Sequence, residues 1–232
     1  MTISARRMTI VRLSVALAVV WATAAILAAG ASAYPTSGYT IWTIAGDGNQ
    51  CSSSTAGCGD GAAATSANLN LPIGVAVDSA GNVIIADTND QRIRKVTPGG
   101  TITTIAGTGN TCSPTTAACG DGAAATSANL NTPDGVAVDS AGDVIIADRN
   151  DNRVRKVTPG GTITTIAGTG DFCSFPTAAC GDGAASTSAN LTNPEGVAVD
   201  SAGNVIIADT NDQRIRKVTP GGTITTIAGT GN

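Results

Sequence analysis

The sequence predicts an all-β fold made of three copies of a four-stranded antiparallel sheet, and three observations predict it. A segment reading Gly-Val-Ala-Val-Asp begins at residues 74, 135 and 196, so one unit recurs every 61 residues. Each unit contains four short strand candidates separated by turns rich in Asn, Asp, Gly and Pro. The second candidate is apolar at consecutive positions, which indicates a sheet covered on both faces.

The strand candidates of the first unit lie at residues 75–78, 83–87, 92–96 and 101–106. Residues 79–82, 88–90 and 98–100 separate them, and these turn residues reverse the chain because they tolerate positive φ or fix one dihedral angle. The resulting pattern predicts an antiparallel meander. An incomplete copy precedes it: residues 41–46 match the closing part of the unit, which predicts an orphan strand at residues 41–45.

Residues 72–96 and their two later copies resemble the NHL repeat. The matching features are Gly-Val-Ala-Val-Asp, the Ala-Asp that ends the second strand and the Arg-Ile-Arg of the third. The resemblance covers residues 39–232 and implies a β-propeller, with blades at about 74–107, 135–168 and 196–229. It also implies a platform for protein, nucleic-acid or ligand contact.

Three blades and an orphan strand predict an open or incomplete ring, because closed propellers have about four to eight blades. Three interpretations remain. The chain is a truncated propeller, it forms an open arc, or two copies meet as a homodimer that completes a six-bladed ring. The first is favoured, because the orphan strand would complete a blade whose other strands lie elsewhere.

Residues 1–33 are expected to be a secretory signal peptide, and residues 34–232 the propeller region. Arg6, Arg7 and Arg12 precede an apolar run at 13–29, and Ala31-Ser32-Ala33 supplies a cleavage site. An uncleaved anchor is the alternative, since the run approaches the length that spans a bilayer. The expected location is therefore secreted, cell surface or periplasm, with no membrane association after cleavage.

The cysteines form three pairs with six residues between the members, one pair for each unit: Cys51/Cys58, Cys112/Cys119 and Cys173/Cys180. Export into an oxidising compartment predicts three local disulfides, each closing a loop that joins two blades. Metal binding or redox chemistry is the alternative, and the absence of His and of a C-x-x-C pair argues against it.

Composition excludes several functions. The chain has no His, so it cannot carry His-based triads or His-ligated zinc. The net charge of −4 argues against nucleic acid as a partner. We therefore expect a non-catalytic binding scaffold without a cofactor, whose partner is a protein or a glycan. The alternatives are a metal-dependent lactonase-like or lyase-like propeller enzyme, and a structural surface protein that assembles by blade-to-blade contact.

Two groups of candidate site residues remain. The first offers oxygen ligands to a hard cation such as calcium, although Asx turns explain the same residues: Asp87, Asn89, Asp148, Asn150, Asp209 and Asn211. The second comprises binding-loop candidates. Phe172 and Phe175 flank Cys173, and Arg149 replaces a threonine of the other units. Packing of both phenylalanines against their own loop is the alternative.

Overall fold

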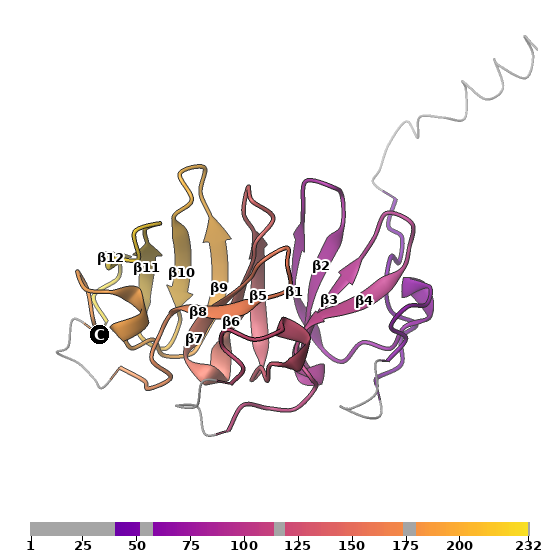
Figure 1. The fold of residues 1–232 in the computed structure, drawn as a ribbon, viewed down its shortest axis with the longest axis horizontal. Helices are drawn as coiled ribbons and strands as arrows, with labels where there is room; N and C mark the ends of the chain where they lie inside the picture. Colours follow the sequence, from indigo (N-terminus) through magenta and orange to yellow (C-terminus); the bar gives the residue numbers. More distant parts are fainter. Residues whose placement is uncertain (1–39, 52–57, 114–118, 174–179, 232) are drawn as a thin grey trace, which may run out of the picture. The chain divides into compact units, whose positions relative to one another are not determined.

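The computed structural model describes residues 40–51, 58–113, 119–173 and 180–231. The predicted signal peptide lies outside these residues, and so do the tips of the three loops between paired cysteines. Residues 43–232 belong to one compact unit. Its strands form three four-stranded antiparallel sheets, each a meander in chain order, which confirms the predicted all-β propeller fold (Figure 1).

The three sheets are here called blades 1, 2 and 3. Blade 1 contains β1 (Pro72–Val77), β2 (Val83–Asp87), β3 (Arg92–Val96) and β4 (Ile102–Ala106). Blade 2 contains β5 (Pro133–Val138), β6 (Val144–Asp148), β7 (Arg153–Val157) and β8 (Ile163–Ala167). Blade 3 contains β9 (Pro194–Val199), β10 (Val205–Asp209), β11 (Arg214–Val218) and β12 (Ile224–Ala228).

Short 3-10 helices connect these strands. One kind precedes the first strand of each blade: η1 (Ala64–Ser66), η3 (Ala125–Ser127) and η5 (Ser186–Ser188). The other follows the second strand of blades 1 and 2: η2 (Thr88–Asp90) and η4 (Arg149–Asp151). The outer strand of one blade contacts the first helix of the next, β4 against η3 and β8 against η5.

The blades pack against one another in chain order. The first strands β1, β5 and β9 are neighbours in that order, and Figure 1 shows the sheets side by side. Every residue of β6 is buried, whereas β10 alternates between buried and partly exposed residues. The predicted coverage of both faces is therefore complete in blade 2, which has a neighbour on each side.

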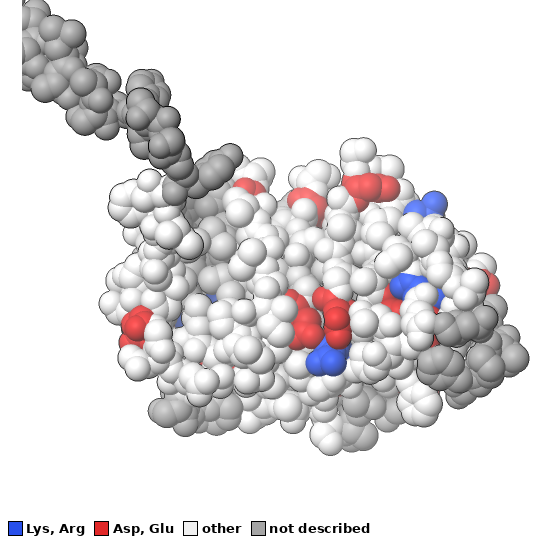
Figure 2. Space-filling view, turned by 180° about the vertical axis from the view of Figure 1, so that it is seen from behind, with Lys and Arg blue, Asp and Glu red and all other residues white. Residues whose placement is uncertain are grey.

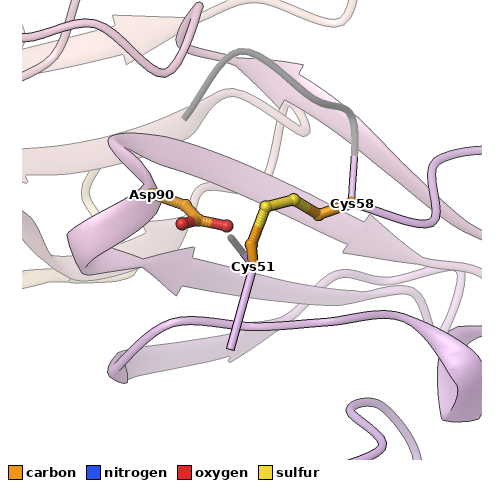
Figure 3. A group of neighbouring side chains, drawn as sticks. All are labelled: Cys51, Cys58 and Asp90. Atoms are coloured by element: carbon orange, nitrogen blue, oxygen red, sulfur yellow. A yellow bond between two sulfur atoms is a disulfide. The ribbon is translucent and has the colours of Figure 1, made fainter. Parts of the chain in front are cut away.

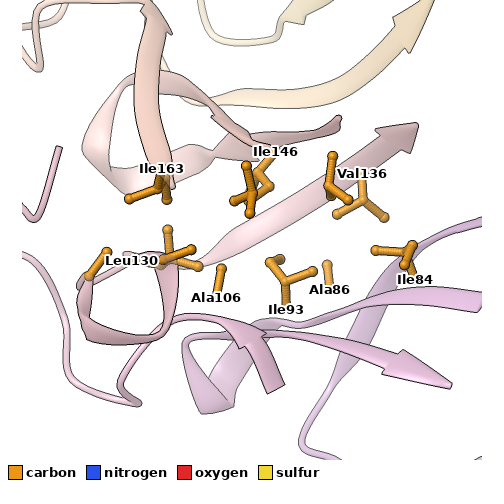
Figure 4. Close-up of a cluster of buried hydrophobic side chains, with 12 residues drawn as sticks. Ile84, Ala86, Ile93, Ala106, Leu130, Val136, Ile146 and Ile163 are labelled. Atoms are coloured by element: carbon orange, nitrogen blue, oxygen red, sulfur yellow. The ribbon is translucent and has the colours of Figure 1, made fainter. Parts of the chain in front are cut away.

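Most of the core lies between blades, and a third cluster lies on the outer face of blade 1, where Ile85, Val96 and Ile102 pack with Ala64 and Ala67 at η1. In the cluster of Figure 4, Ala86, Ile93 and Ala106 of blade 1 face Val136 and Ile146 of blade 2. A second cluster repeats the arrangement between blades 2 and 3. Since each blade contributes one apolar face to each neighbour, most of the hydrophobic stabilisation of a blade comes from stacking.

Two expectations about strand ends need correction. The first strand begins at Pro72 instead of Val75, and a bulge between these residues interrupts its pairing with β2. The orphan strand expected at residues 41–45 is not formed. An outer strand such as β4 pairs with the third strand of its own blade, and the described residues contain no third strand for this segment.

Candidate functional site

The three predicted disulfides are present and confirm the pairing: Cys51–Cys58, Cys112–Cys119 and Cys173–Cys180. Their Cα atoms are 5.6–5.7 Å apart, which is an ordinary separation for a disulfide. Each bridge closes the base of a loop next to the Gly-Asp-Gly turn that leads into the following blade. The loops are thus held at the same position on all three blades.

The binding-loop candidates fall partly inside the described chain. Phe172 has an exposed fraction of 64%, while the neighbouring Cys173 is buried. Phe175 lies outside the described residues. At the positions equivalent to Phe172, the first and second loops carry Gln50 and Thr111. Among the three loops, therefore, the third alone has an aromatic residue at this position.

A fully buried arginine joins each loop to its blade: Arg94, Arg155 and Arg216. In blade 1, Arg94 Nη1 lies 3.1 Å from Asp87 Oδ2, and its Nη2 lies 2.7 Å from Asp60 Oδ1 in the Gly-Asp-Gly turn. The same two ion pairs recur in blade 2, at 3.3 and 2.6 Å, and in blade 3, at 3.2 and 2.7 Å. The arginine therefore bridges two carboxylates that come from different parts of the repeat.

This cluster uses the carboxylates that the sequence offered as cation ligands. Asp87 Oδ2 contacts Arg94, and Asp87 Oδ1 accepts a hydrogen bond of 2.7 Å from Asn70 N–H. Asp148 and Asp209 contact the equivalent arginines, and their Oδ1 atoms accept hydrogen bonds from Asn131 N–H and Thr192 N–H. The asparagines lie exposed on the following turns: Asn89, Asn150 and Asn211. Both oxygens of each aspartate carboxylate thus already have a partner within the blade. Cation binding by the Asp–Asn pairs stays a prediction.

A third buried carboxyl group lies beside each disulfide, at a position that no sequence motif indicated. Asp90 has an exposed fraction of 2%, and its carboxyl group is turned toward the bridge between Cys51 and Cys58 (Figure 3). One oxygen of Asp90 and the two sulfur atoms lie within 4.8 Å of one another, and Asp151 and Asp212 repeat this group. Sulfur ligates metals as thiolate, so the closed disulfide does not make this group a metal centre.

Burial changes the charge of these acids. Burial, together with the neighbouring Asp148, raises the pKa of Asp151 to about 8. Burial also raises the pKa of Asp90, and it raises that of Asp87 to about 6. At neutral pH, Asp151 is therefore mostly protonated. The only sequence signal was its fixed place in an Asp-x-Asn-Asp turn, which does not indicate burial.

The family model of the teneurin NHL domain matches the chain three times, at residues 35–108, 101–175 and 165–232. The chain belongs to this family. The predicted NHL resemblance is thereby confirmed. Mouse teneurin-3 is 30% identical over 190 residues, and Caenorhabditis elegans teneurin-1 is 30% identical over 251 residues.

The NHL domain spans a small part of these relatives. The mouse match covers 80% of this chain and 7% of teneurin-3, and the nematode match covers 75% and 9%. Among solved structures, virginiamycin B lyase from Staphylococcus aureus matches at 18% identity with a TM-score of 0.42, over 67% of this chain and 40% of the lyase. A gluconolactonase from Xanthomonas campestris matches at 11% identity with a TM-score of 0.47, over 69% and 48%. Similarity this low does not bear on activity.

The surface of the NHL domain carries its charges in small groups. The basic side chains form no continuous patch on the face drawn in Figure 2. Arg149, a predicted binding residue, lies 3.2 Å from Glu195 of blade 3 and 3.6 Å from Asp134 of blade 2. At the junction of blades 1 and 2, Thr88 takes its place and donates a hydrogen bond of 2.8 Å to the carbonyl of Pro133. Arg149 therefore links two blades.

The junctions between blades also form two equivalent clefts. The first, between blades 1 and 2, has a volume of about 430 Å³ and includes Lys95, Thr104 and Val144 in its lining. The second, of about 470 Å³, is lined by the matching Lys156, Thr165 and Val205.

Among the described residues, none of the helices has the length and apolar character needed to cross a bilayer.

The stability of the NHL domain is expected to fall as the pH rises from about 4 to about 8. A carboxyl group with a raised pKa in the folded state stabilises the fold below its unfolded pKa of 3.8, and this contribution is lost as the pH rises through the folded value of about 8. Asp151→Asn removes the titration and should flatten the upper part of the profile. Thermal unfolding of both proteins across this range measures the difference.

Asp78→Asn is the control, because Asp78 is partly exposed at its turn and hydrogen bonds from Asn82 lower its pKa. This variant should keep the downward slope near pH 8. Parallel profiles for the wild-type chain and Asp151→Asn would show that Asp151 titrates normally.

Proposed function

We propose that this NHL domain is an exported, non-catalytic scaffold whose disulfide-closed loops bind a protein. Its polar residues support this role, because the buried arginines and aspartates engage one another within each blade. Three disulfides support export, since such bridges persist in oxidising compartments. The proposed location is the cell surface, the periplasm or the medium.

The exposure of Phe172 is the observation that best supports the proposal. A large aromatic side chain with an exposed fraction of 64% contributes little hydrophobic stabilisation to the fold, and aromatic residues are enriched at protein interfaces. The buried disulfide between Cys173 and Cys180 holds the base of the loop. A loop restrained in this way loses less conformational entropy when it binds.

A displayed random-peptide library, selected on the immobilised chain, tests this function. Selected peptides should bind Phe172→Thr at least about tenfold more weakly, a loss of about 1.4 kcal/mol. The second loop carries Thr111 at the equivalent position, so Phe172→Thr gives the third loop the residue that the second loop has there. Gln50→Thr makes the same type of change in the first loop and should leave binding intact.

Two outcomes would contradict the proposal. Peptides that bind the wild-type chain and Phe172→Thr equally would place the contact elsewhere. Binding to a glycan array, with no peptide selected, would replace the protein partner by a carbohydrate.

A further inference from the structure

The two ends of the blade stack expose part of the surface that the internal junctions bury, while Ile85, Val96 and Ile102 on the outer face of blade 1 stay buried beside η1. At the outer face of blade 3, a hollow of about 300 Å³ is lined by Ala208, Ile215 and Ala228 among others. The equivalent residues of blade 1 are Ala86, Ile93 and Ala106, each with an exposed fraction of 0% beneath blade 2 (Figure 4). The hollow therefore has the composition of a surface that a blade covers.

The outer face of blade 1 is the matching surface. Val75 of this blade has an exposed fraction of 69%, and its equivalent in blade 2, Val136, has one of 7% because it packs against blade 1. Val77 and Ile73 are exposed on the same strand, at 64% and 54%. In blades 2 and 3, the first strand packs against the preceding blade. In blade 1, the same apolar strand is uncovered within the described chain.

The glycine of the first strand lies where the next blade makes a close backbone approach. A Cβ atom added at Gly74 would collide with the backbone carbonyl of Asp134, and one added at Gly135 would collide with that of Glu195. The equivalent Gly196 of blade 3 has room, since its Cβ would meet only Ala208 Cβ at 3.4 Å. Gly196 thus leaves space for a strand that the described chain does not place there.

A segment near the start of the described chain occupies part of the free face of blade 1. Gly46 N–H and Asp47 N–H donate hydrogen bonds of 2.9 and 3.0 Å to the carbonyls of Ala64 and Ala67, at η1. At the next junction, Gly107 and Thr108, which follow β4, donate the same pair to Ala125 and Ala128, at 3.0 and 2.9 Å. Residues 43–47 therefore imitate the end of an outer strand.

We propose that blade 3 of one copy docks on blade 1 of a second copy in the geometry of the internal junctions, and that residues 43–47 compete with this docking. The residues that follow β12 of the incoming copy need the carbonyls of Ala64 and Ala67, which Gly46 and Asp47 hold. The contact is head to tail, because two different surfaces meet. Two such junctions in one pair would bring six blades together.

Release of the segment tests the proposal. Gly46→Pro removes the N–H donor, and proline cannot adopt the φ of +90° found at Gly46. Asp47→Ala removes the hydrogen bond that Asn68 donates to this carboxylate. In sedimentation velocity, the exported chain carrying both changes should self-associate at least about tenfold more tightly than the wild type, because more of blade 1 is free to bind.

Gly196→Ala provides the decisive variant. In the released background it should restore the monomer, since the new methyl group occupies the space kept for the incoming strand. Gly221→Ala is the matched control, because its Cβ would meet only Thr219 Oγ1 at 3.8 Å, and it should leave the assembly intact. Phe172→Thr should also leave the mass unchanged, which separates this proposal from loop binding.

Either of two results would overturn the proposal: released chains that stay monomeric up to millimolar concentration, or an assembly that Gly196→Ala does not weaken. If the released variant fails to fold by circular dichroism, the wild-type chain at millimolar concentration replaces it. Its association must then be weakened by Gly196→Ala and not by Gly221→Ala.

Discussion

Gly135→Ala is expected to destabilise the chain by about 3 kcal/mol, whereas Gly196→Ala should change its stability by less than about 1 kcal/mol. At Gly135 the added methyl group collides with the Glu195 carbonyl, so β5 and β9 must separate. At Gly196 it meets one methyl group at ordinary contact distance, and the unfolded chain loses some entropy in compensation. Urea unfolding of the monomer measures both effects.

Gly74→Ala extends this comparison, since its methyl group collides with the Asp134 carbonyl. It should behave like Gly135→Ala, because both glycines lie at internal junctions. Equal destabilisation by the variants at Gly135 and Gly196 would indicate that the intrinsic preference of the strand matters, and not the approach of the next blade.

Arg155→Met should cost about 3–5 kcal/mol, because it leaves the buried Asp148 carboxylate without its cation. The same change releases Asp121 and with it the Gly-Asp-Gly turn after the second disulfide. The comparison is Lys156→Met, the next residue of β7. Lys156 pairs with Asp143 at 2.8 Å in a partly exposed position, so its loss should cost about 0–1 kcal/mol.

Adding Asp148→Asn and Asp121→Asn to Arg155→Met separates charge from packing. The triple variant removes the uncompensated carboxylates and should recover much of the lost stability in urea unfolding. If the triple variant is as unstable as Arg155→Met, the arginine contributes through its packing and its contact with the turn, and the ion pairs contribute little.

The local pattern of the sequence was sufficient for the four strands of each blade, apart from the start of the first strand, and for the disulfides. Asn, Asp, Gly and Pro turns separate apolar runs such as residues 83–87, and the structure places β2 at the same bounds. Each Cys pair closes a short loop, so proximity along the chain already favours the observed pairing. These features depend on neighbours in the sequence, which a single repeat already contains.

The candidate site could be predicted only in part. The sequence placed Phe172 in a loop and left its exposure open, and the structure gives the exposure. The contacts of Arg149 could not be predicted, because its partner Glu195 comes from another blade. Asp90 was also missed. Its carboxyl group lies beside the bridge between Cys51 and Cys58, and both cysteines are distant from Asp90 in the sequence.

The sequence by itself therefore determined the repeat, the four strands of each blade, the three disulfides and the need for each blade to stack. The tertiary structure decided which charges are buried, that residues 41–45 form no strand, and which surfaces stay uncovered at the two ends. The reason is physical. Strand propensity and short loop closure act within one unit, whereas burial and hydrogen-bond competition depend on which other unit lies alongside.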